Sequence, residues 1–481
     1  MILDSLEPRS VFRFFEDLCT IPHGSGNTRA LSDRLVRFAA ERGLEQHQDA
    51  LGNVVIIAPA APGYESAPPV IVQGHLDMVC AVAPGCEKDM TKEGPALFVE
   101  GDTVGARGTS LGGDDGAAVA IALALLDDSA LPRPRLEAVF TVGEETGMGG
   151  ARALDVTPLR GRTMLNLDSE AEGVFTVACA GGAHVTLHRA AETETRTARL
   201  LRLGVEGLLG GHSGTEIHKG RANANILLGR LLSALRSAAP VALVSAAGGT
   251  ATNAIPCAAE AVIAAAEADV MPLLDAADKL CSALRREFAD TDPGLRLRAE
   301  VGPPGEVEAM TEEETGRFIG ALCAVPDGVQ ARSRQLPGLV ETSLNLGLLS
   351  ADASGWTLTF SIRSSAPDGK PELVETLRKS AEIAGAEVTV DGDYPAWVFR
   401  QESPLRTRMQ RIYRTMFNAE PIITAIHAGL ECGILAEKLP GLDCVSIGPD
   451  MRGIHTPAER LSIPSMARTW EFVKEILKES V

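Results

Sequence analysis

The sequence predicts an α/β protein with a mostly parallel sheet and an inserted α+β domain. Three observations lead to this prediction. Short apolar strands alternate with helical stretches at first, antiparallel strand pairs follow, and the α/β texture then returns. In addition, a chain of 481 residues is too long for one hydrophobic core. We therefore expect a discontinuous domain of residues 1–184 and 395–481, and an inserted domain of residues 185–394.

The composition restricts the partners of this protein. The formal net charge is -19, from 64 acidic and 45 basic residues. Nucleic acids and anionic membranes need clustered Lys and Arg, so neither is expected as a partner. The first residues contain no basic segment followed by an apolar one, and the nine cysteines form no Cys-X-X-Cys pair. We therefore expect a cytoplasmic protein with reduced thiols.

The elements follow from apolar spacing, which has a period near 3.6 in helices and 2 in strands. In the first segment we expect helices at residues 10–19, 27–42 and 117–126, and strands at residues 54–57, 70–73, 138–142 and 164–167. In the inserted domain we expect strands at residues 200–205, 241–246, 260–265, 295–301 and 356–362, and helices at residues 224–235, 270–288 and 373–383. In the last segment we expect a helix at residues 404–417, strands at residues 421–423 and 444–447, and a closing helix from residue 464.

A histidine and an aspartate follow the strand expected at residues 70–73. His75 and Asp77 stand two positions apart, so on an extended chain they face the same side. An imidazole beside a carboxylate suits a first-row divalent metal. Because a satisfied surface pair has the same pattern, the other strand ends must decide between the two interpretations.

Further acidic residues and a second histidine lie just beyond the ends of other expected strands. They are Asp114, Glu144, Glu145, Asp168 and His455. Open α/β sheets bind ligands at the carboxyl ends of their strands. Two histidines and several carboxylates are what two divalent ions require, with one aspartate shared between them. Of two adjacent glutamates, one can bind metal while the other acts as a general base.

The ordered set of motifs resembles the M20 metallopeptidase family, and within it the aminoacyl-histidine dipeptidase branch. The resemblance runs essentially end to end. It is carried by Gly74-His75-Leu76-Asp77, Gly113-Asp114-Asp115-Gly116, Gly143-Glu144-Glu145-Thr146-Gly147, the strand before Asp168, the loop of His455, and branch-like stretches at residues 211–214, 220–225, 343–347, 362–365 and 427–433. It implies a zinc-peptidase-like catalytic domain, with the inserted domain as a lid.

The resemblance implies a ligand role for five residues. His75 and Asp168 would hold one metal ion, Glu145 and His455 the other, and Asp114 would bridge them. Zinc is the metal expected first, and cobalt and manganese suit the same donors.

The resemblance also implies two supporting roles. Glu144 would be the general base and then the proton donor to the leaving amine. Asp77 would fix the tautomer of His75 rather than bind metal. The peptide bond between Asp114 and Asp115 would be cis.

The inserted domain would supply substrate contacts. By resemblance, His212 would stabilise the oxyanion, although a loop histidine without a role is the alternative. Arg363 would clamp the free carboxylate of the substrate, with a surface arginine as the alternative, and Asn253 would hold the same end. His427 lies in a branch-like stretch, but no chemistry can be assigned to it.

We therefore predict a cytosolic, two-metal dipeptidase that hydrolyses small Xaa-His and related dipeptides, such as β-alanyl-histidine. The resemblance allows a homodimer in which a lid histidine acts across the interface. Two alternatives remain open. One is a deacylase or amidohydrolase of N-acyl amino acids with the same metal site, and the other is a non-catalytic binding protein on the same fold.

Overall fold

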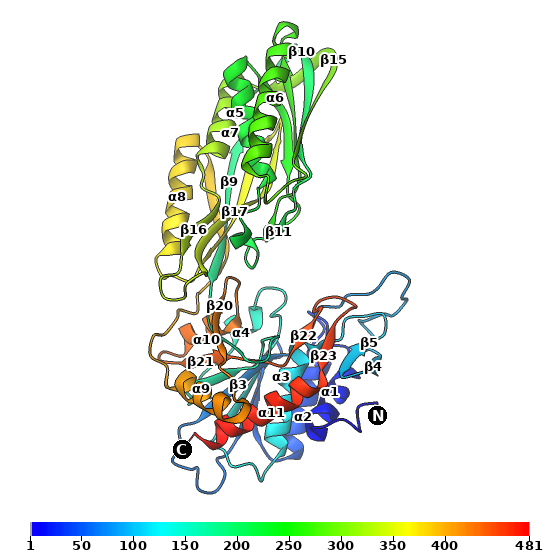
Figure 1. The fold of residues 1–481 in the computed structure, drawn as a ribbon, viewed down its shortest axis with the longest axis vertical. Coiled ribbons are helices and arrows are strands. Elements are labelled where there is room, and N and C mark those ends of the chain that lie inside the picture. Colours follow the sequence, from blue (N-terminus) through cyan, green and yellow to red (C-terminus); the bar gives the residue numbers. More distant parts are fainter. Residues whose placement is uncertain (1, 481) are drawn as a thin grey trace. The chain divides into compact units, whose positions relative to one another are not determined.

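The structure, a computed structural model, describes residues 2–480 (Figure 1). The chain divides into two compact units. Unit 1 comprises the chain up to Cys179, Phe399–Ala425 and the chain from Leu430 onward. Unit 2 comprises Ala180–Val398 and the short segment Ile426–Gly429. The predicted fold class, an α/β part interrupted by an α+β insertion, is confirmed.

Among the described residues, an eight-stranded sheet forms the centre of unit 1, in the order β1-β2-β6-β3-β7-β21-β8-β20. Neighbouring strands from β6 to β21 pair in parallel, whereas the pairs β1–β2, β2–β6 and β21–β8 are antiparallel. The parallel strands are β6 (Leu136–Thr141), β3 (Val70–His75), β7 (Thr163–Asn166) and β21 (Asp443–Ser446). The flanking strands are β1 (Glu45–Gln48), β2 (Val54–Ala58), β8 (Val174–Cys179) and β20 (Ile422–Ile426).

The strands of unit 1 direct alternate side chains into one core, as a period of two residues requires. Val54 and Ile56 of β2 enter this core, as do Val70 and Val72 of β3. The same core contains apolar side chains of α1 (Arg9–Cys19), α2 (Arg29–Glu41), α3 (Gly113–Asp127), α9 (Pro404–Phe417) and α11 (Ile463–Lys478). Helix α10 (Glu431–Lys438) packs against α4 (Gly149–Ala153) and β21.

A small sheet beside this core was not predicted. It consists of β4 (Leu97–Glu100), β5 (Thr103–Ala106), β22 (Met451–Arg452) and β23 (Arg460–Ser462). Strands of two to four residues contain too few positions for a clear apolar alternation. The hairpin of β22 and β23 nevertheless matters, because its loop contains His455.

Within residues 2–480, a nine-stranded sheet forms unit 2, and its neighbouring strands pair antiparallel. Its strands are β9 (Gly181–Ala190), β10 (Thr193–Glu206), β12 (Ala242–Gly248), β14 (Ala259–Ala265), β15 (Arg296–Met310), β16 (Gly328–Arg332), β17 (Val340–Asp352), β18 (Gly355–Ser364) and β19 (Glu387–Tyr394). One core joins this sheet to α5 (Ala224–Ala238), α6 (Val270–Glu287), α7 (Glu312–Ala324) and α8 (Gly369–Ala384) (Figure 1). The helix α7 and the strands β9, β16, β17 and β19 were not predicted. Across residues 2–480, no helix is long and apolar enough to cross a membrane.

Candidate metal centre

The candidate site lies at the carboxyl ends of the parallel strands of unit 1. Strand β3 ends at His75, β6 ends three residues before Glu144, and β7 ends two residues before Asp168. Because β6, β3 and β7 are parallel neighbours, their carboxyl ends meet at one edge of the sheet. Side chains that are distant in the sequence therefore converge there.

Asp114 stands between two histidines. Its Oδ1 lies 3.1 Å from Nε2 of His75, and its Oδ2 lies 3.1 Å from Nε2 of His455. A carboxylate that offers one oxygen to each of two imidazole nitrogens has the arrangement expected of a ligand shared by two metal ions. The peptide bond between Asp114 and Asp115 is cis, which confirms the expectation from the family resemblance.

Each histidine has a second carboxylate beside it. Nε2 of His75 lies 3.7 Å from Oδ1 of Asp168, and Nε2 of His455 lies 2.9 Å from Oε1 of Glu145. The structure thus brings together the five residues that the sequence nominates as ligands. Two groups of potential ligand atoms overlap at His75, one with Asp114 and Glu145 and the other with Asp115 and Asp168.

Irregular backbone carries several of these side chains. His455 lies in the loop between β22 and β23 with a φ of 60°, a left-handed conformation that is uncommon outside glycine. Asp114 and Asp115 lie in the first turn of α3 but have non-helical backbone angles. Such conformations persist where the surrounding structure fixes them, and they cluster at functional sites.

The electrostatics of the cluster favour positive charge. Burial would lower the pKa of His75, but its hydrogen bond with Asp114 and the charges of Asp168 and Asp115 raise this pKa well above its usual range. Hydrogen bonds with Asp114 and Glu145 raise the pKa of His455 to about 10. Both imidazoles therefore lie where carboxylates stabilise a cation.

The carboxylates themselves divide into two kinds. Although burial acts to raise the pKa of Asp114, hydrogen bonds with His455 and His75 hold it well below its usual range. Burial raises the pKa of Asp115 and of Asp168 well above the usual range; the charge of Asp114 adds to the effect on both, and that of Asp115 adds to the effect on Asp168.

The donor chemistry fits divalent metal ions. Two imidazole nitrogens and several crowded carboxylates are a typical ligand set for zinc, cobalt or manganese. Among the described residues, Oδ1 of Asp115 is buried without a hydrogen-bond partner. A bound cation would offset the mutual repulsion of these buried carboxylates.

Glu144 carries a carboxyl group whose pKa lies close to neutrality. Burial, together with the charges of Glu431 and Glu145, raises this pKa to about 8, although His75 acts to lower it. A carboxyl group in this range can both take up and release a proton at physiological pH.

Asp77 contacts His75 through its backbone. Nδ1 of His75 donates to the carbonyl oxygen of Asp77 over 2.8 Å, whereas the nearer carboxylate oxygen is 3.7 Å away. Because a carbonyl oxygen can only accept, Nδ1 carries the proton. Nε2 therefore faces Asp114 as the nitrogen available to a metal ion.

Unit 2 brings His212 and Asn253 together on a short ribbon. Strand β11 (Gly211–His212) pairs with β13 (Ala254–Ile255), and the N–H of Ser213 donates to the carbonyl oxygen of Asn253 over 2.8 Å. The side chain of Asn253 is exposed.

The contacts of His212 define its tautomer. The backbone N–H groups of Gly214 and Thr215 donate to its Nδ1 over 3.1 and 3.0 Å. Burial and the charge of Arg363 lower its pKa, which favours the neutral ring. A neutral ring that accepts at Nδ1 carries its proton at Nε2, so His212 can donate a hydrogen bond from that atom.

Arg363, on β18, retains an unused donor. Its side chain is buried, and Nη1 donates to the hydroxyl oxygen of Tyr394 over 3.0 Å. Among the described residues, its Nε has no hydrogen-bond partner. His427 lies nearby in unit 2, with Nε2 2.7 Å from Oγ of Ser343, and burial together with the charge of Arg363 lowers its pKa to about 3.

Two buried glutamates of unit 1 were not singled out from the sequence. Oε2 of Glu431 accepts hydrogen bonds from Thr141 (2.5 Å) and Gln73 (2.7 Å), and burial raises its pKa to about 7. Glu459 accepts hydrogen bonds from the backbone of the Asp114 loop. Glu431 lies inside a branch-like stretch, which was a signal, whereas nothing in the sequence distinguishes Glu459 from a surface acid.

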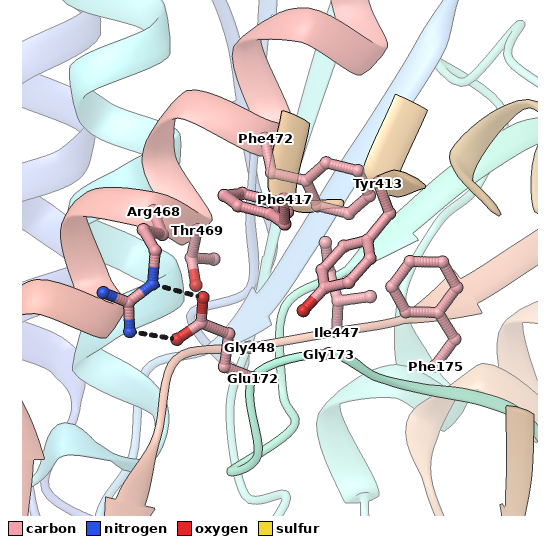
Figure 2. A pocket seen from close by; sticks show the side chains of 10 residues that line it. All are labelled: Glu172, Gly173, Phe175, Tyr413, Phe417, Ile447, Gly448, Arg468, Thr469 and Phe472. Carbon is pink, nitrogen blue, oxygen red and sulfur yellow. Dashed lines mark hydrogen bonds and ion pairs between the residues drawn. The ribbon is translucent and has the colours of Figure 1, made fainter. Parts of the chain in front are cut away.

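A small cavity lies against the loop that follows Asp168 (Figure 2). Figure 2 shows the guanidinium of Arg468 paired with both carboxylate oxygens of Glu172, at 2.6 and 2.7 Å. The aromatic walls are Phe175, Tyr413, Phe417 and Phe472. Its space of about 10 Å³ has room for about one water molecule. The cavity is therefore too small for a peptide, and its contacts anchor the loop.

Comparisons with known proteins agree with this geometry. Residues 71–479 match the model of peptidase family M20/M25/M40. The cytosol non-specific dipeptidase of Escherichia coli (strain K12) is 37% identical over 479 residues, which cover 99% of each chain.

Solved structures give the same result. The crystal structure of aminoacylhistidine dipeptidase from Vibrio alginolyticus superposes with a TM-score of 0.91 at 34% identity, and covers 99% of this chain and 97% of that one. Aminopeptidase PepT from Bacillus cereus ATCC 10987 has a TM-score of 0.57 at 16% identity over 99% of both chains, a likeness of fold alone.

Proposed function

The chain belongs to peptidase family M20/M25/M40, and on this premise we propose that it is a cytoplasmic dipeptidase that hydrolyses Xaa-His and related dipeptides, such as β-alanyl-histidine. The observation that carries the proposal is the Asp114 carboxylate, which offers one oxygen to His75 and the other to His455. That arrangement is suited to a reaction that uses two divalent metal ions.

The ligands divide into two sets with one member in common. His75 and Asp168 form the first set, Glu145 and His455 form the second, and Asp114 belongs to both. When bound, two divalent ions supply Lewis acidity, which polarises a carbonyl group and lowers the pKa of water. Zinc is the metal that we expect first, and cobalt or manganese fits the same donors.

Glu144 acts as the general base and later as the general acid. Its carboxylate removes a proton from the attacking water and then delivers that proton to the nitrogen of the leaving amine. Its pKa of about 8, which burial raises, supports a group that changes protonation state during each cycle. The side chain of Asp77 holds the backbone of Glu144.

Residues of unit 2 bind the substrate. His212 donates from Nε2 to the carbonyl oxygen as negative charge develops there, a role that its tautomer supports. Arg363 binds the free carboxylate of the dipeptide through donors such as its unpartnered Nε, and Asn253 assists at the same end.

The relatives support this substrate class. The Escherichia coli protein is named a cytosol non-specific dipeptidase and the Vibrio alginolyticus protein an aminoacylhistidine dipeptidase. Both names refer to dipeptides, and the first supports a cytoplasmic location. They differ in how strictly the second residue is specified, so this preference must be measured.

A substrate panel tests the proposal. Metal-reconstituted protein is offered β-alanyl-histidine, other Xaa-His dipeptides, dipeptides without histidine, and N-acyl amino acids. We expect hydrolysis of the dipeptides, its loss on treatment with a chelator, and its recovery on addition of zinc, cobalt or manganese. Faster turnover of the N-acyl amino acids would instead identify a deacylase, and activity that survives complete metal removal would contradict the mechanism.

A further inference from the structure

One buried carboxylate binds the backbone of the loop that leads to Asp114. Oε1 of Glu459 accepts the N–H of Gly113 at 2.8 Å and that of Asp114 at 3.4 Å. Its Oε2 accepts the N–H of Leu111 at 2.8 Å and that of Gly112 at 3.2 Å. Glu459 is only 2% exposed, and its two carboxylate oxygens together accept hydrogen bonds from four consecutive backbone N–H groups.

These N–H groups stabilise the carboxylate in place of a cation. Burial acts to raise the pKa of Glu459, and the groups that act to lower it are these backbone N–H donors rather than a Lys or Arg, although most buried carboxylates need a charged partner. Consecutive backbone N–H groups at the start of a helix carry partial positive charge and bind anions. Here α3 begins at Gly113, so the carboxylate occupies the anion position of the loop.

Two glycines precede Asp114, and the second of them, Gly113, faces this contact. A Cβ on Gly113 would lie 3.2 Å from Oε1 of Glu459 and 3.0 Å from the sulfur of Met451. Gly112 has a φ of 74°, a left-handed conformation that side chains disfavour. Gly113 therefore allows the carboxylate to approach the backbone closely, and Gly112 allows the left-handed turn of the loop.

Glu459 also belongs to the loop that presents His455. The two residues are four positions apart in the hairpin between β22 and β23, and the N–H of Glu459 donates to the carbonyl oxygen of Thr456 over 3.1 Å. One side chain therefore ties the His455 loop to the Asp114 loop. Those two loops meet where Nε2 of His455 lies 3.1 Å from Oδ2 of Asp114.

We propose that Glu459 is a positioning residue of the metal centre, which fixes the Asp114 carboxylate against His455 and thereby sets the affinity for metal ions. This inference rests on the proposed function, because it takes Asp114 and His455 as metal ligands. Residues that orient ligands in this indirect way commonly change metal affinity by about 10- to 100-fold when they are replaced.

A purely structural role is the alternative, and the chain offers a matched control for it. Glu137, on β6, is fully buried, and its carboxylate accepts the N–H groups of Arg160 and Gly161 over 3.0 Å. It lies at the start of that strand, whereas the candidate ligands follow the end. Glu137→Gln therefore removes a similar backbone contact without touching either loop.

The experiment compares the full-length protein with Glu459→Gln and Glu137→Gln. Glutamine keeps the size of glutamate, but it has a single acceptor oxygen and turns an NH₂ group toward two of the N–H donors. Zinc and manganese affinities are measured by competition with a chromophoric chelator, and thermal unfolding of the metal-free proteins is measured in parallel. We expect two ions on the wild type and on Glu137→Gln with equal affinity, and binding about 10- to 100-fold weaker in Glu459→Gln.

Each other outcome overturns a defined statement. Wild-type affinity in Glu459→Gln, or an equal loss in Glu137→Gln, overturns the positioning role while leaving the proposed function intact. A wild type that binds no metal overturns the proposed function and this inference with it. If Glu459→Gln fails to fold, Gly113→Ala crowds the same contact from the other side, and unchanged metal affinity in that variant overturns the inference.

Discussion

The backbone N–H of Glu144 donates a hydrogen bond to Oδ1 of Asp77 over 3.1 Å. The other oxygen of this carboxylate, Oδ2, accepts from the hydroxyl of Ser25 over 2.9 Å. His75, in contrast, donates to the backbone carbonyl oxygen of Asp77. Asp77 thus uses its backbone to orient the imidazole of His75 and its side chain to hold the residue proposed as general base.

Asp77→Ala tests this division of roles. Because the carbonyl oxygen remains, Nδ1 of His75 keeps its acceptor, and we expect metal affinity to stay within a few-fold of the wild type. The backbone of Glu144 loses its acceptor, so we expect kcat to fall about 10²-fold through misplacement of the base. Steady-state kinetics and a chelator competition measure the two quantities. Loss of metal with little change in kcat at saturating metal would reverse the assignment.

Glu144→Ala tests the base itself. Removal of a general base typically slows turnover by about 10²- to 10⁴-fold, so we expect kcat to fall by that amount. Glu145 and the other ligands are unchanged, so the metal content should remain at the wild-type level. Atomic absorption and dipeptide hydrolysis provide the two measurements. Thr146→Ala, at an exposed neighbouring position, should behave as the wild type, and near-normal turnover in Glu144→Ala would contradict the mechanism.

The fold class could be predicted because apolar patterning is a strong signal where strands and helices are long. The helix expected at residues 404–417 is α9 (Pro404–Phe417) without change, and the strand expected at residues 54–57 is β2 with one more residue. Unpredicted strands include the two-residue β22 and the edge strand β19, whose exposed positions follow no clear apolar alternation. Helix α3 begins at Gly113 rather than at residue 117, because glycine and aspartate do not signal a helix.

The candidate site residues were predicted from their positions just after expected strands. That prediction depends only on the topology of the sheet. It therefore reached His75 and Asp168, which follow parallel strands. It did not reach Glu459, because a carboxylate that binds backbone N–H groups has no sequence pattern of its own. It also could not distinguish the backbone of Asp77 from its side chain as the partner of His75, because both lie at the same position in the sequence.

Arg363→Ala tests carboxylate recognition when it is combined with a change of substrate. A charged hydrogen bond contributes about 1.5 to 3 kcal/mol, so we expect kcat/KM for a free dipeptide to fall by about 10- to 150-fold. For the wild type, kcat/KM should fall by a similar factor when the free dipeptide is replaced by one with an amidated carboxyl terminus. For Arg363→Ala, the same replacement of substrate should change kcat/KM little. Arg378→Ala, on the exposed side of α8, is the control. If Arg363→Ala lowers kcat/KM equally for the free and the amidated dipeptide, the arginine does not bind the free carboxylate.

Asp327 gives unit 2 a dependence on pH that is separate from the metal centre. Its Oδ1 accepts from the N–H of Leu346 and from Nδ2 of Asn223, each over 3.1 Å. Burial nevertheless raises its pKa to about 7 in the folded protein, although these hydrogen bonds act to lower it. Between the ordinary pKa near 4 and this raised value, the folded chain holds a proton that the unfolded chain has released.

The free energy of unfolding should therefore fall as pH rises from about 4 to 7, by about 1.4 kcal/mol for each unit by which the folded pKa exceeds the unfolded one. Asp327→Asn removes the ionisable group and keeps an acceptor oxygen, so its stability relative to the wild type should rise between pH 5 and pH 8. Urea denaturation in the same metal-free buffers measures this difference. Asp352→Asn is the control, because hydrogen bonds from Ser354 hold the pKa of Asp352 below its usual range, and its effect should be equal at both pH values. An equal effect of Asp327→Asn at pH 5 and pH 8 would show that Asp327 is already ionised in the folded protein at pH 5.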